Sequence, residues 1–311
     1  IESGAFNASK AATALGLCPR RLPNRKPASR IARRSGDCAK RFPEPYCRGV
    51  FAATCAVSVD TGRGPCKTMS DAEQRPDPRK SLRLFRTIPH PCSYLDNEEA
   101  STVFVDPEVI PSIDLLSELS EIGFRRSGPH VYRPDCGSCK ACVSVRIPTG
   151  AFSPNRRFKR VLTRNQDVTI TTTLSIATNP DARALYERYV NTRHQDGDMF
   201  PASQEQFDSF IVSPSESTRF FLFTVGTKLI AVTVCDELRQ GLSAVYTFFD
   251  PDESKRSPGT FAILSLIAHA RLKQLPYVFL GYWVKDCRKM EYKLDFRPIE
   301  LLQDKRWIRI N

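Results

Sequence analysis

Long apolar stretches are absent from this 311-residue sequence. No window offers about 18 consecutive apolar residues, so we expect no transmembrane helix. The chain from residue 69 onward also lacks a secretory signal, which predicts a reducing compartment, the cytoplasm. In that compartment we expect cysteines to act as metal ligands or free thiols rather than as disulfides.

The first 68 residues lack methionine and any sustained hydrophobic period of 2 or 3.6 residues. They hold 13 Lys and Arg against 4 Asp and Glu, whereas residues 69–311 hold 33 against 30. We predict that residues 1–68 are a disordered leader upstream of a natural start at Met69, the first methionine. An Arg-rich targeting peptide is the alternative. Because the remainder is close to neutral, any nucleic-acid contact there must be local.

Three cysteines at intervals of three stand out in the remaining chain: Cys136, Cys139 and Cys142. Two overlapping CxxC units let thiolates converge on one soft metal ion and leave one ligand to find. We expect Cys92 to be that ligand. A shell of four thiolates fits structural zinc and an iron–sulfur cluster equally well, and free thiols are the alternative. Cys235 and Cys287 stand alone in the sequence and are predicted to be buried thiols.

Residues 69–150 carry the pattern of a small cysteine-rich α+β module at the N-terminal side of the chain. A helix is predicted at 113–122, where apolar residues recur on one helical face before Gly123. Strands are predicted at 82–88, 103–105, 130–133 and 143–147. The predicted core is modest, so a metal would hold the loops of this module together.

A basic run follows at 155–164, with five cations in nine residues and apolar residues interleaved at helical spacing. One side of such a helix can pack while the other faces phosphate, which makes Arg156, Arg157 and Arg160 candidate contacts to a polyanion. A solvated surface is the alternative interpretation.

The order of elements predicted between residues 151 and 311 resembles the acetyltransferase-like fold of the GNAT superfamily. Asn179 and Pro180 open a helix, and Ser257 and Pro258 are predicted to cap and begin another. The predicted elements are a strand at 168–174, helices from 179 and at 204–211, a hairpin of strands 220–225 and 229–234, a strand at 242–249, a buried helix at 260–273, a strand at 277–281 and a helix or turn at 283–294. In that fold the loop before the buried helix binds a pyrophosphate, here through Lys255, Arg256 and Gly259. Phe261 departs from the usual loop motif, which argues against coenzyme A.

Several separated motifs, in the right order, carry a second resemblance. They are His90-Pro91-Cys92-Ser93-Tyr94-Leu95, Tyr132-Arg133-Pro134 before the cysteine triplet, Tyr246-Thr247-Phe248-Phe249-Asp250-Pro251, Gly281-Tyr282-Trp283 and Lys289-Met290-Glu291-Tyr292-Lys293. The region from 82 to 311 thereby resembles the arginyl-tRNA-protein transferase family, most closely its bacterial leucyltransferase branch. The leader has no counterpart in that family.

The resemblance implies an enzyme that moves leucine, or alternatively arginine, from charged tRNA to the N-terminal Asp or Glu of proteins and so marks them for degradation. It implies a monomer that needs no cofactor for transfer, with aminoacyl-tRNA and acidic N-termini as partners. Phosphates at the tRNA 3′ end would meet Lys255, Arg256 and Gly259, and the tRNA backbone further away would meet Arg156, Arg157 and Arg160. The alternatives are a zinc-stabilised tRNA-binding adaptor and a coenzyme A-dependent N-acetyltransferase.

Four residues of the C-terminal motifs are candidates for the chemistry. Tyr246 or Tyr282 would donate a hydrogen bond to the oxyanion, Asp250 would position or deprotonate the amine, and Lys293 would pair with the acidic side chain of the acceptor. An aminoacyl ester is already activated, and a protein α-amine with a pKa near 7.7–8.0 is partly neutral at physiological pH. Alignment and oxyanion stabilisation are therefore the main requirements, and no strong base is needed. Core packing for the tyrosines, a turn for Asp250 and a surface salt bridge for Lys293 are the alternatives.

Overall fold

The computed structural model describes residues 5–17, 82–195, 197, 199–212 and 215–311. All of these residues belong to one compact unit of the chain. The predicted start at Met69 and the leader cysteines lie outside the described residues. None of the described helices has both the length and the apolar character that crossing a lipid bilayer requires.

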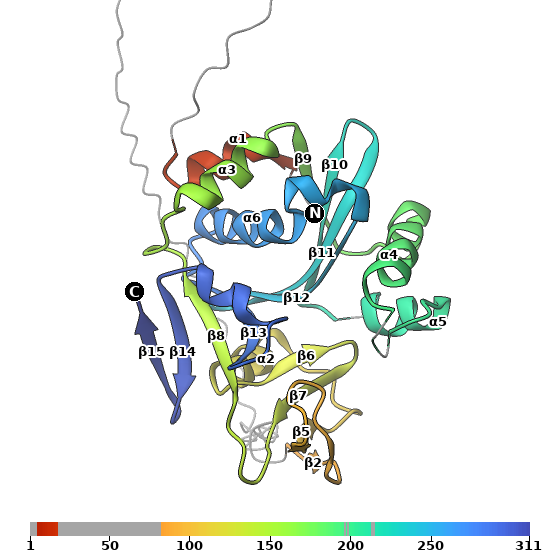
Figure 1. Ribbon diagram of the computed structural model, residues 1–311, viewed down its shortest axis with the longest axis vertical. Coiled ribbons are helices and arrows are strands. Elements are labelled where there is room, and N and C mark those ends of the chain that lie inside the picture. Colours follow the sequence, from red (N-terminus) through yellow and green to blue (C-terminus); the bar gives the residue numbers. More distant parts are fainter. Residues whose placement is uncertain (1–4, 18–81, 196, 198, 213–214) are drawn as a thin grey trace, which may run out of the picture. The chain divides into compact units, whose positions relative to one another are not determined.

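A nine-stranded sheet forms the centre of the described structure (Figure 1). In spatial order its strands are β1 (Ala5–Asn7), β9 (Val168–Thr173), β10 (Thr218–Val225), β11 (Lys228–Leu238), β12 (Gly241–Phe249), β13 (Tyr277–Val284), β8 (Cys142–Pro148), β14 (Ile299–Gln303) and β15 (Arg306–Ile310). All neighbours in this sheet run antiparallel except β12 and β13, which run parallel. The parallel pair requires a crossover, and helix α6 (Pro258–Leu272) supplies it.

Helices cover both faces of the sheet. Helices α1 (Ala8–Ala14), α3 (Arg156–Arg164) and α6 lie next to one another in Figure 1. Phe221 and Phe223 of β10 pack in the core with these three helices, whereas Phe220 packs with α4 (Pro180–Arg193) in a second core. Successive side chains of a strand point to opposite faces, so this alternation shows a buried layer on each side.

Two helix starts were predicted from capping residues in the sequence, and the structure shows how each helix begins. The side chain of Asn179 accepts a hydrogen bond of 3.0 Å from Ala182 N, with Pro180 in the first turn, as predicted. Pro258 also occupies the first turn of α6, but the predicted side-chain cap at Ser257 is wrong. Ser257 has a φ of 55°, in the left-handed region, and its side chain makes no capping hydrogen bond. The predicted helix at 204–211 begins as α5 (Gln204–Gln206) and continues as a π-helical turn (Phe207–Ile211).

A smaller layer precedes the large sheet in the chain. Its four-stranded sheet has the order β2 (Leu84–Arg86), β5 (Thr102–Val105), β7 (His130–Pro134) and β6 (Arg125–Ser127), and β3 (His90–Pro91) pairs separately with β4 (Glu99–Ala100). Helix α2 (Ile113–Glu121) contributes Leu116 and Leu119 to a core that also contains Leu238 and Phe279 of the large sheet. The small layer therefore shares its core with the large sheet.

Three features differ from the sequence predictions. Strand β8, expected in the N-terminal module, is an interior strand of the large sheet, so the expected boundary after residue 150 does not separate two sheets. Residues 5–17 of the predicted disordered leader form β1 and α1, and β1 pairs antiparallel with β9. Of the segment 283–294, predicted as a helix or turn, Trp283 and Val284 instead continue β13, and only the 3-10 turn at Glu291–Asp295 agrees with the prediction.

Candidate active site

Strands β12 and β13 pair over only three residues and then separate. Their parallel register runs from Gly241 opposite Tyr277 to Ser243 opposite Phe279. Beyond this point β12 shifts register against β11, so Val245 has no partner residue on β11. Strand β13 likewise shifts register against β8, so Leu280 has no partner residue on β8. Bulges of this kind end pairing and redirect strands, and they are frequent next to active sites. The point where the two strands separate is therefore the candidate site.

Two buried cations bind the backbone at this opening. Arg125 of β6 is 6% exposed and donates a 3.0 Å hydrogen bond to the carbonyl of Ala244. Lys293, from the 3-10 turn, is 5% exposed and donates to the carbonyl of Tyr282. Burial, followed by the charge of Arg125, lowers the pKa of Lys293 to about 7. Arg125 was not among the residues selected from the sequence, and Lys293 was.

Tyr282 lies beside these cations, but its hydroxyl already makes hydrogen bonds within the protein. It donates a 2.6 Å hydrogen bond to the carbonyl of Gly123 and lies 3.3 Å from the carbonyl of Tyr132. Burial, followed by Tyr132, raises the pKa of Tyr282 well above its ordinary value, so the hydroxyl stays protonated. The geometry favours a packing role for Tyr282, which ties β13 to the small layer.

Three packed aromatic side chains, the aromatic wall, lie near the turn that carries Lys293. The rings of Tyr189 and Phe249 are 4.8 Å apart, and that of Tyr246 lies 6.4 Å from Tyr189. Tyr292 is 44% exposed, but desolvation of its hydroxyl, followed by the nearby Tyr189, raises its pKa to about 12. Since Tyr292 and Lys293 are consecutive, one short turn connects the aromatic wall with the cations.

Of the two tyrosines predicted to be catalytic, Tyr246 has the hydroxyl with the weaker hydrogen-bond partner. Its hydroxyl contacts Met199 Sδ at 3.5 Å, and a thioether is only a weak acceptor. Burial, followed by Tyr189 and Tyr186, raises the pKa of Tyr246 far above its ordinary value. A phenol in this state can donate a hydrogen bond but cannot act as a base.

Asp250, predicted to position or deprotonate the amine, is 1% exposed and pairs with two cations. Arg188 lies 2.5 Å from one carboxylate oxygen, and Lys228 lies 2.8 Å from the other. The carboxylate also caps the turn that follows β12 by accepting from Asp252 N at 3.0 Å. Burial acts to raise its pKa, but hydrogen bonds from Lys228 and Asp252 N and the charge of Arg188 hold the pKa below its ordinary value. The geometry favours a structural role.

Replacing Asp250 by asparagine is expected to cost about 2 kcal/mol of stability, since a cap and two ion pairs with half-exposed cations weaken. The loss should be present above the ordinary Asp pKa near 3.9 and disappear as the pH falls through the lower folded pKa. Urea unfolding at pH 7 and pH 3 measures this, with Asp252→Asn as the exposed control. A fall in kcat of about 100-fold with unchanged stability would instead identify a base.

In the predicted phosphate-binding loop, Arg256 is engaged in ion pairs within the protein. Arg256 holds Asp167 through two hydrogen bonds of 2.7 and 2.8 Å and Glu253 through one of 2.8 Å. The carbonyl of Lys255 accepts from Arg164, while Gly259 has space beside it. A cavity of about 480 Å³ at this loop is lined by three acidic and three basic residues, which gives no net attraction for phosphate.

Helix α3 presents its basic residues to solvent. Its N-terminal cap is Asn155, which accepts a 3.0 Å hydrogen bond from Phe158 N, and Phe158 is buried as predicted. Arg157 pairs with Asp295 at 2.5 Å, which places α3 next to the turn that carries Lys293. Arg156 and Arg160 are exposed, and within the described part of the chain neither forms an ion pair.

The predicted ligand cysteines lie near one another: Cys92 follows β3, Cys136 and Cys139 lie between β7 and β8, and Cys142 begins β8. Burial, followed by Cys136, Cys92, Cys139 and Cys287, raises the pKa of Cys142 to about 12. Cys287 is thus a neighbour of the triplet, which its isolated place in the sequence did not indicate. Within the described ranges, however, no group of three or more His, Cys, Asp or Glu is placed so that it could hold a metal ion. The donor chemistry fits a soft metal, but the predicted four-cysteine geometry is not formed.

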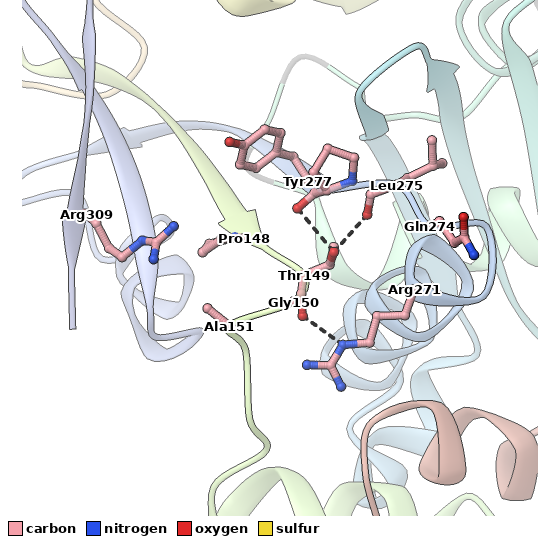
Figure 2. A pocket seen from close by; sticks show the side chains of 10 residues that line it. Pro148, Thr149, Gly150, Ala151, Arg271, Gln274, Leu275, Tyr277 and Arg309 are labelled. Carbon is pink, nitrogen blue, oxygen red and sulfur yellow. Dashed lines mark hydrogen bonds between the residues drawn. The ribbon is translucent and has the colours of Figure 1, made fainter.

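A separate cavity of about 410 Å³ lies at the opposite end of β13 (Figure 2). Thr149 donates through its hydroxyl to the carbonyl of Leu275 at 2.8 Å, and its own carbonyl accepts from Arg271 at 2.7 Å. None of the residues predicted for the chemistry lines this cavity. Thr149 and Arg271 bond to other residues that line it, so the cavity does not present them to a ligand.

Comparison with known proteins defines first a class of enzyme, the aminoacyltransferases. The family description "Arginine-tRNA-protein transferase, N terminus" matches residues 90–160, and "Arginine-tRNA-protein transferase, C terminus" matches residues 181–303. Together these matches cover more than half of the chain, which therefore belongs to the arginine-tRNA-protein transferase family.

Individual relatives lie in the bacterial branch of that family. The aspartate/glutamate leucyltransferase of Teredinibacter turnerae is 51% identical over 231 residues, which are 74% of this chain and 95% of the relative. That of Pseudomonas putida is 50% identical over 230 residues, 74% of this chain and 97% of the relative. That of Pseudomonas syringae pv. tomato is 49% identical over 229 residues, with the same two shares. The predicted family and branch are confirmed.

Proposed function

We propose that this protein transfers leucine from leucyl-tRNA to the N-terminal Asp or Glu of other proteins and so marks them for degradation. The observation that carries this proposal is 51% identity to an aspartate/glutamate leucyltransferase across 95% of its length. We expect the enzyme to work as a monomer in the cytoplasm.

The proposed reaction is aminolysis of an ester. The neutral α-amine of the acceptor attacks the carbonyl carbon of the aminoacyl ester, and a C–N bond forms while the bond to the terminal ribose oxygen breaks. The amine loses its proton, and the ribose hydroxyl is regenerated on the tRNA. The amine is partly neutral near pH 8, so the protein mainly aligns the reactants and stabilises the oxyanion.

Tyr246 is the residue to which we assign oxyanion stabilisation. Its hydroxyl has only the weak acceptor Met199 Sδ at 3.5 Å, whereas that of Tyr282 bonds to the carbonyl of Gly123 at 2.6 Å. A donor that is held in place and stays protonated can stabilise developing negative charge without reorganisation. Asp250 acts in this proposal by fixing the end of β12, and Lys293 pairs with the acidic side chain of the acceptor.

Leucine is favoured over arginine as the donor by the composition of the aromatic wall. Tyr189, Tyr246 and Phe249 offer an apolar surface, and the guanidinium of Arg193 lies 5.8 Å from the ring centre of Phe249. A cation at this position repels the side chain of arginine and leaves that of leucine unaffected.

The acetyltransferase-like arrangement is the fold that we propose for residues 151–311. Its support is the order of β9 to β13, with α6 crossing between the parallel strands β12 and β13, and the separation of these strands at the site. Acetyl transfer from coenzyme A is the competing activity, and the ion pairs of Arg256 with Asp167 and Glu253 oppose it.

One assay distinguishes these possibilities: an Asp-starting peptide is incubated in turn with labelled leucyl-tRNA, arginyl-tRNA and acetyl-CoA. We expect transfer from leucyl-tRNA and much slower transfer from arginyl-tRNA or acetyl-CoA. Faster transfer from arginyl-tRNA would change the donor, and transfer from acetyl-CoA alone would change the reaction. A tRNA-binding adaptor would leave the peptide unlabelled with all three donors.

We assign the backbone of the tRNA to helix α3, because Arg156 and Arg160 are exposed cations beside the turn that carries Lys293. The double variant Arg156→Glu and Arg160→Glu is expected to raise KM for leucyl-tRNA at least about tenfold through lost phosphate contacts, with a smaller salt dependence. Steady-state kinetics at two salt concentrations measures both effects. Arg183→Glu, on the surface of α4, is the control. An unchanged KM would exclude α3 as the contact.

A metal supplies no step of this mechanism. Cys92, Cys136, Cys139 and Cys142 remain the ligands that we propose for structural zinc or an iron–sulfur cluster, with rearrangement of their loops on binding. Cys139→Ser is expected to lose most of any bound metal and to lower the unfolding temperature, as elemental analysis and calorimetry would measure. Cys235→Ser, in the core of the large sheet, is the control for metal content. Full metal content in Cys139→Ser would exclude the four-cysteine site.

A further inference from the structure

Two buried cations face the same side of Gly281. A β-carbon added to Gly281 would lie 3.7 Å from Arg125 Nε and 3.8 Å from Lys293 Nζ. Gly281 has a φ of 78°, where glycine is favoured. Because glycine has no side chain, nothing at this position separates the two cations. Their charged groups therefore converge on one small region at the opening between β12 and β13.

No anion balances these charges in the described part of the chain. Neither Arg125 nor Lys293 forms an ion pair there with a carboxylate. The charge of Asp236 acts on Arg125, but Asp236 is held by Arg126 through two hydrogen bonds of 2.7 and 2.8 Å. The other ionisable groups that act on the two cations are the phenols of Tyr132 and Tyr282 and the thiols of Cys142 and Cys287. Phenols and thiols carry no charge at neutral pH in their ordinary state. Burying two like charges without a counter-ion is strongly unfavourable, and the pKa of Lys293, lowered to about 7 by burial and then by Arg125, reflects this. The two groups together therefore suit an anionic ligand.

We infer that Arg125 is the residue that determines specificity for the acceptor, by binding the side-chain carboxylate of its N-terminal Asp or Glu opposite Lys293. The inference rests on the proposed function, which supplies an acidic N-terminus as the substrate. Arg125 is suited to the task because its planar guanidinium has five N–H donors and binds carboxylates through two parallel hydrogen bonds. The bond to the Ala244 carbonyl fixes the guanidinium in place.

Burial decides between a peptide carboxylate and a phosphate of the tRNA. Arg125 and Lys293 are 6% and 5% exposed, and their charged groups face a glycine rather than solvent. A small carboxylate on a flexible side chain fits such a position better than a backbone phosphate, which needs exposed cations. An acceptor that begins with Asn or Gln brings no charge and leaves both cations unbalanced, so the site rejects it.

Peptide binding without tRNA tests this assignment independently of transfer. Two peptides that differ only in Asp or Asn at the first position are titrated into the wild-type protein, Arg125→Gln, Arg125→Lys and the control Arg133→Gln. We expect Arg125→Gln to weaken binding of the Asp peptide at least about 30-fold, Arg125→Lys to retain part of the affinity, and Arg133→Gln to resemble the wild type. Affinities are corrected for the folded fraction, which the number of binding sites in each titration gives.

Kinetics then separates the possible outcomes. In Arg125→Gln the ratio of kcat/KM for the Asp and Asn peptides should fall at least tenfold, with an unchanged KM for leucyl-tRNA. This ratio does not depend on how much of the variant is folded. An unchanged ratio, unchanged peptide binding, or a defect only in the KM for tRNA overturns the assignment. A wild-type protein that binds the Asp peptide through Arg125 but transfers no leucine would overturn the proposed function and leave the assignment standing.

Discussion

Replacing Lys293 by methionine is expected to lower kcat/KM for an Asp-starting peptide about 100-fold and at the same time to stabilise the protein. The lost activity reflects a carboxylate that enters a buried site with one of its two cations removed, a change that typically costs about 2–5 kcal/mol. The gain in stability arises because Lys293 is buried and its pKa is lowered to about 7, chiefly by burial and then by Arg125. Methionine fills a similar volume without that cost.

The pH dependence of the gain follows from the direction of this pKa shift. Below about pH 7 the lysine is charged in both the folded and the unfolded wild type, and the full cost of burying the charge is present. Between about pH 7 and pH 10 the unfolded state binds more protons, so the stability of the wild type rises toward that of the variant. We therefore expect Lys293→Met to be more stable by about 2–4 kcal/mol at pH 7, with little difference remaining near pH 10.

Denaturant unfolding at both pH values, together with kinetics on the Asp peptide, measures these two effects. Lys285→Met is the matched control, because Lys285 is an exposed lysine in the segment between β13 and the 3-10 turn. It should change neither the stability nor the preference for acidic acceptors. Unchanged kinetics of Lys293→Met on the Asp peptide would contradict the role of Lys293.

The second large effect is expected from Asp236→Asn, which leaves Arg126 buried without its counter-charge. The side chains of Arg126 and Asp236 are 4% and 1% exposed, and Thr218 donates a further hydrogen bond of 3.0 Å to the same carboxylate. Breaking a buried pair of this kind from one side costs about 3–5 kcal/mol. For a chain of this size the unfolding temperature should fall by about 10 °C.

Calorimetry of Asp236→Asn and of Glu237→Gln compares a buried pair with a half-exposed one. Glu237, next in the chain, pairs with Arg219 and Lys273 at partly exposed positions and should contribute about 1 kcal/mol or less. Because Arg126 adjoins Arg125 on β6, Asp236→Asn should also reduce the preference for Asp over Asn peptides. A variant that unfolds at the wild-type temperature would contradict the importance of this pair for holding β6 on the sheet.

Local signals in the sequence predicted most of the individual elements. Asn179 with Pro180 marked the start of α4, and the glycine at 226 between two apolar runs marked the hairpin of β10 and β11. These signals work because a cap or a turn is decided by a few neighbouring residues. The exception at Ser257 has a physical reason, since a residue with a φ of 55° does not have the extended backbone of a side-chain cap.

Long-range pairing was not predictable in the same way. Strands β14 and β15 at the end of the chain were missed, and β8 was assigned to the small module although it pairs with β13 and β14. A strand that is short carries the same pattern whichever sheet it joins. The pairing of β1 with β9 was missed for the same reason, because Ala5–Asn7 is only three residues long.

The residues that we propose for the site were predicted only where family motifs supplied them. Lys293 and Tyr246 come from such motifs, and both lie at the opening between β12 and β13. Arg125 was not predicted, because the burial of Arg125 and Arg126 depends on contacts with strands more than 90 positions away. Gly123 and Gly128 on either side of β6, both with positive φ, were the available signal that this segment is conformationally constrained.

Transfer of leucine itself is the most direct test of the account. The wild-type protein is incubated with leucyl-tRNA and two peptides that begin with Asp or Asn, and the products are identified by mass spectrometry. We predict one added leucine on the α-amine of the Asp peptide and at least about 100-fold slower addition to the Asn peptide. No leucine on the Asp peptide, or equal rates on both peptides, would contradict the account.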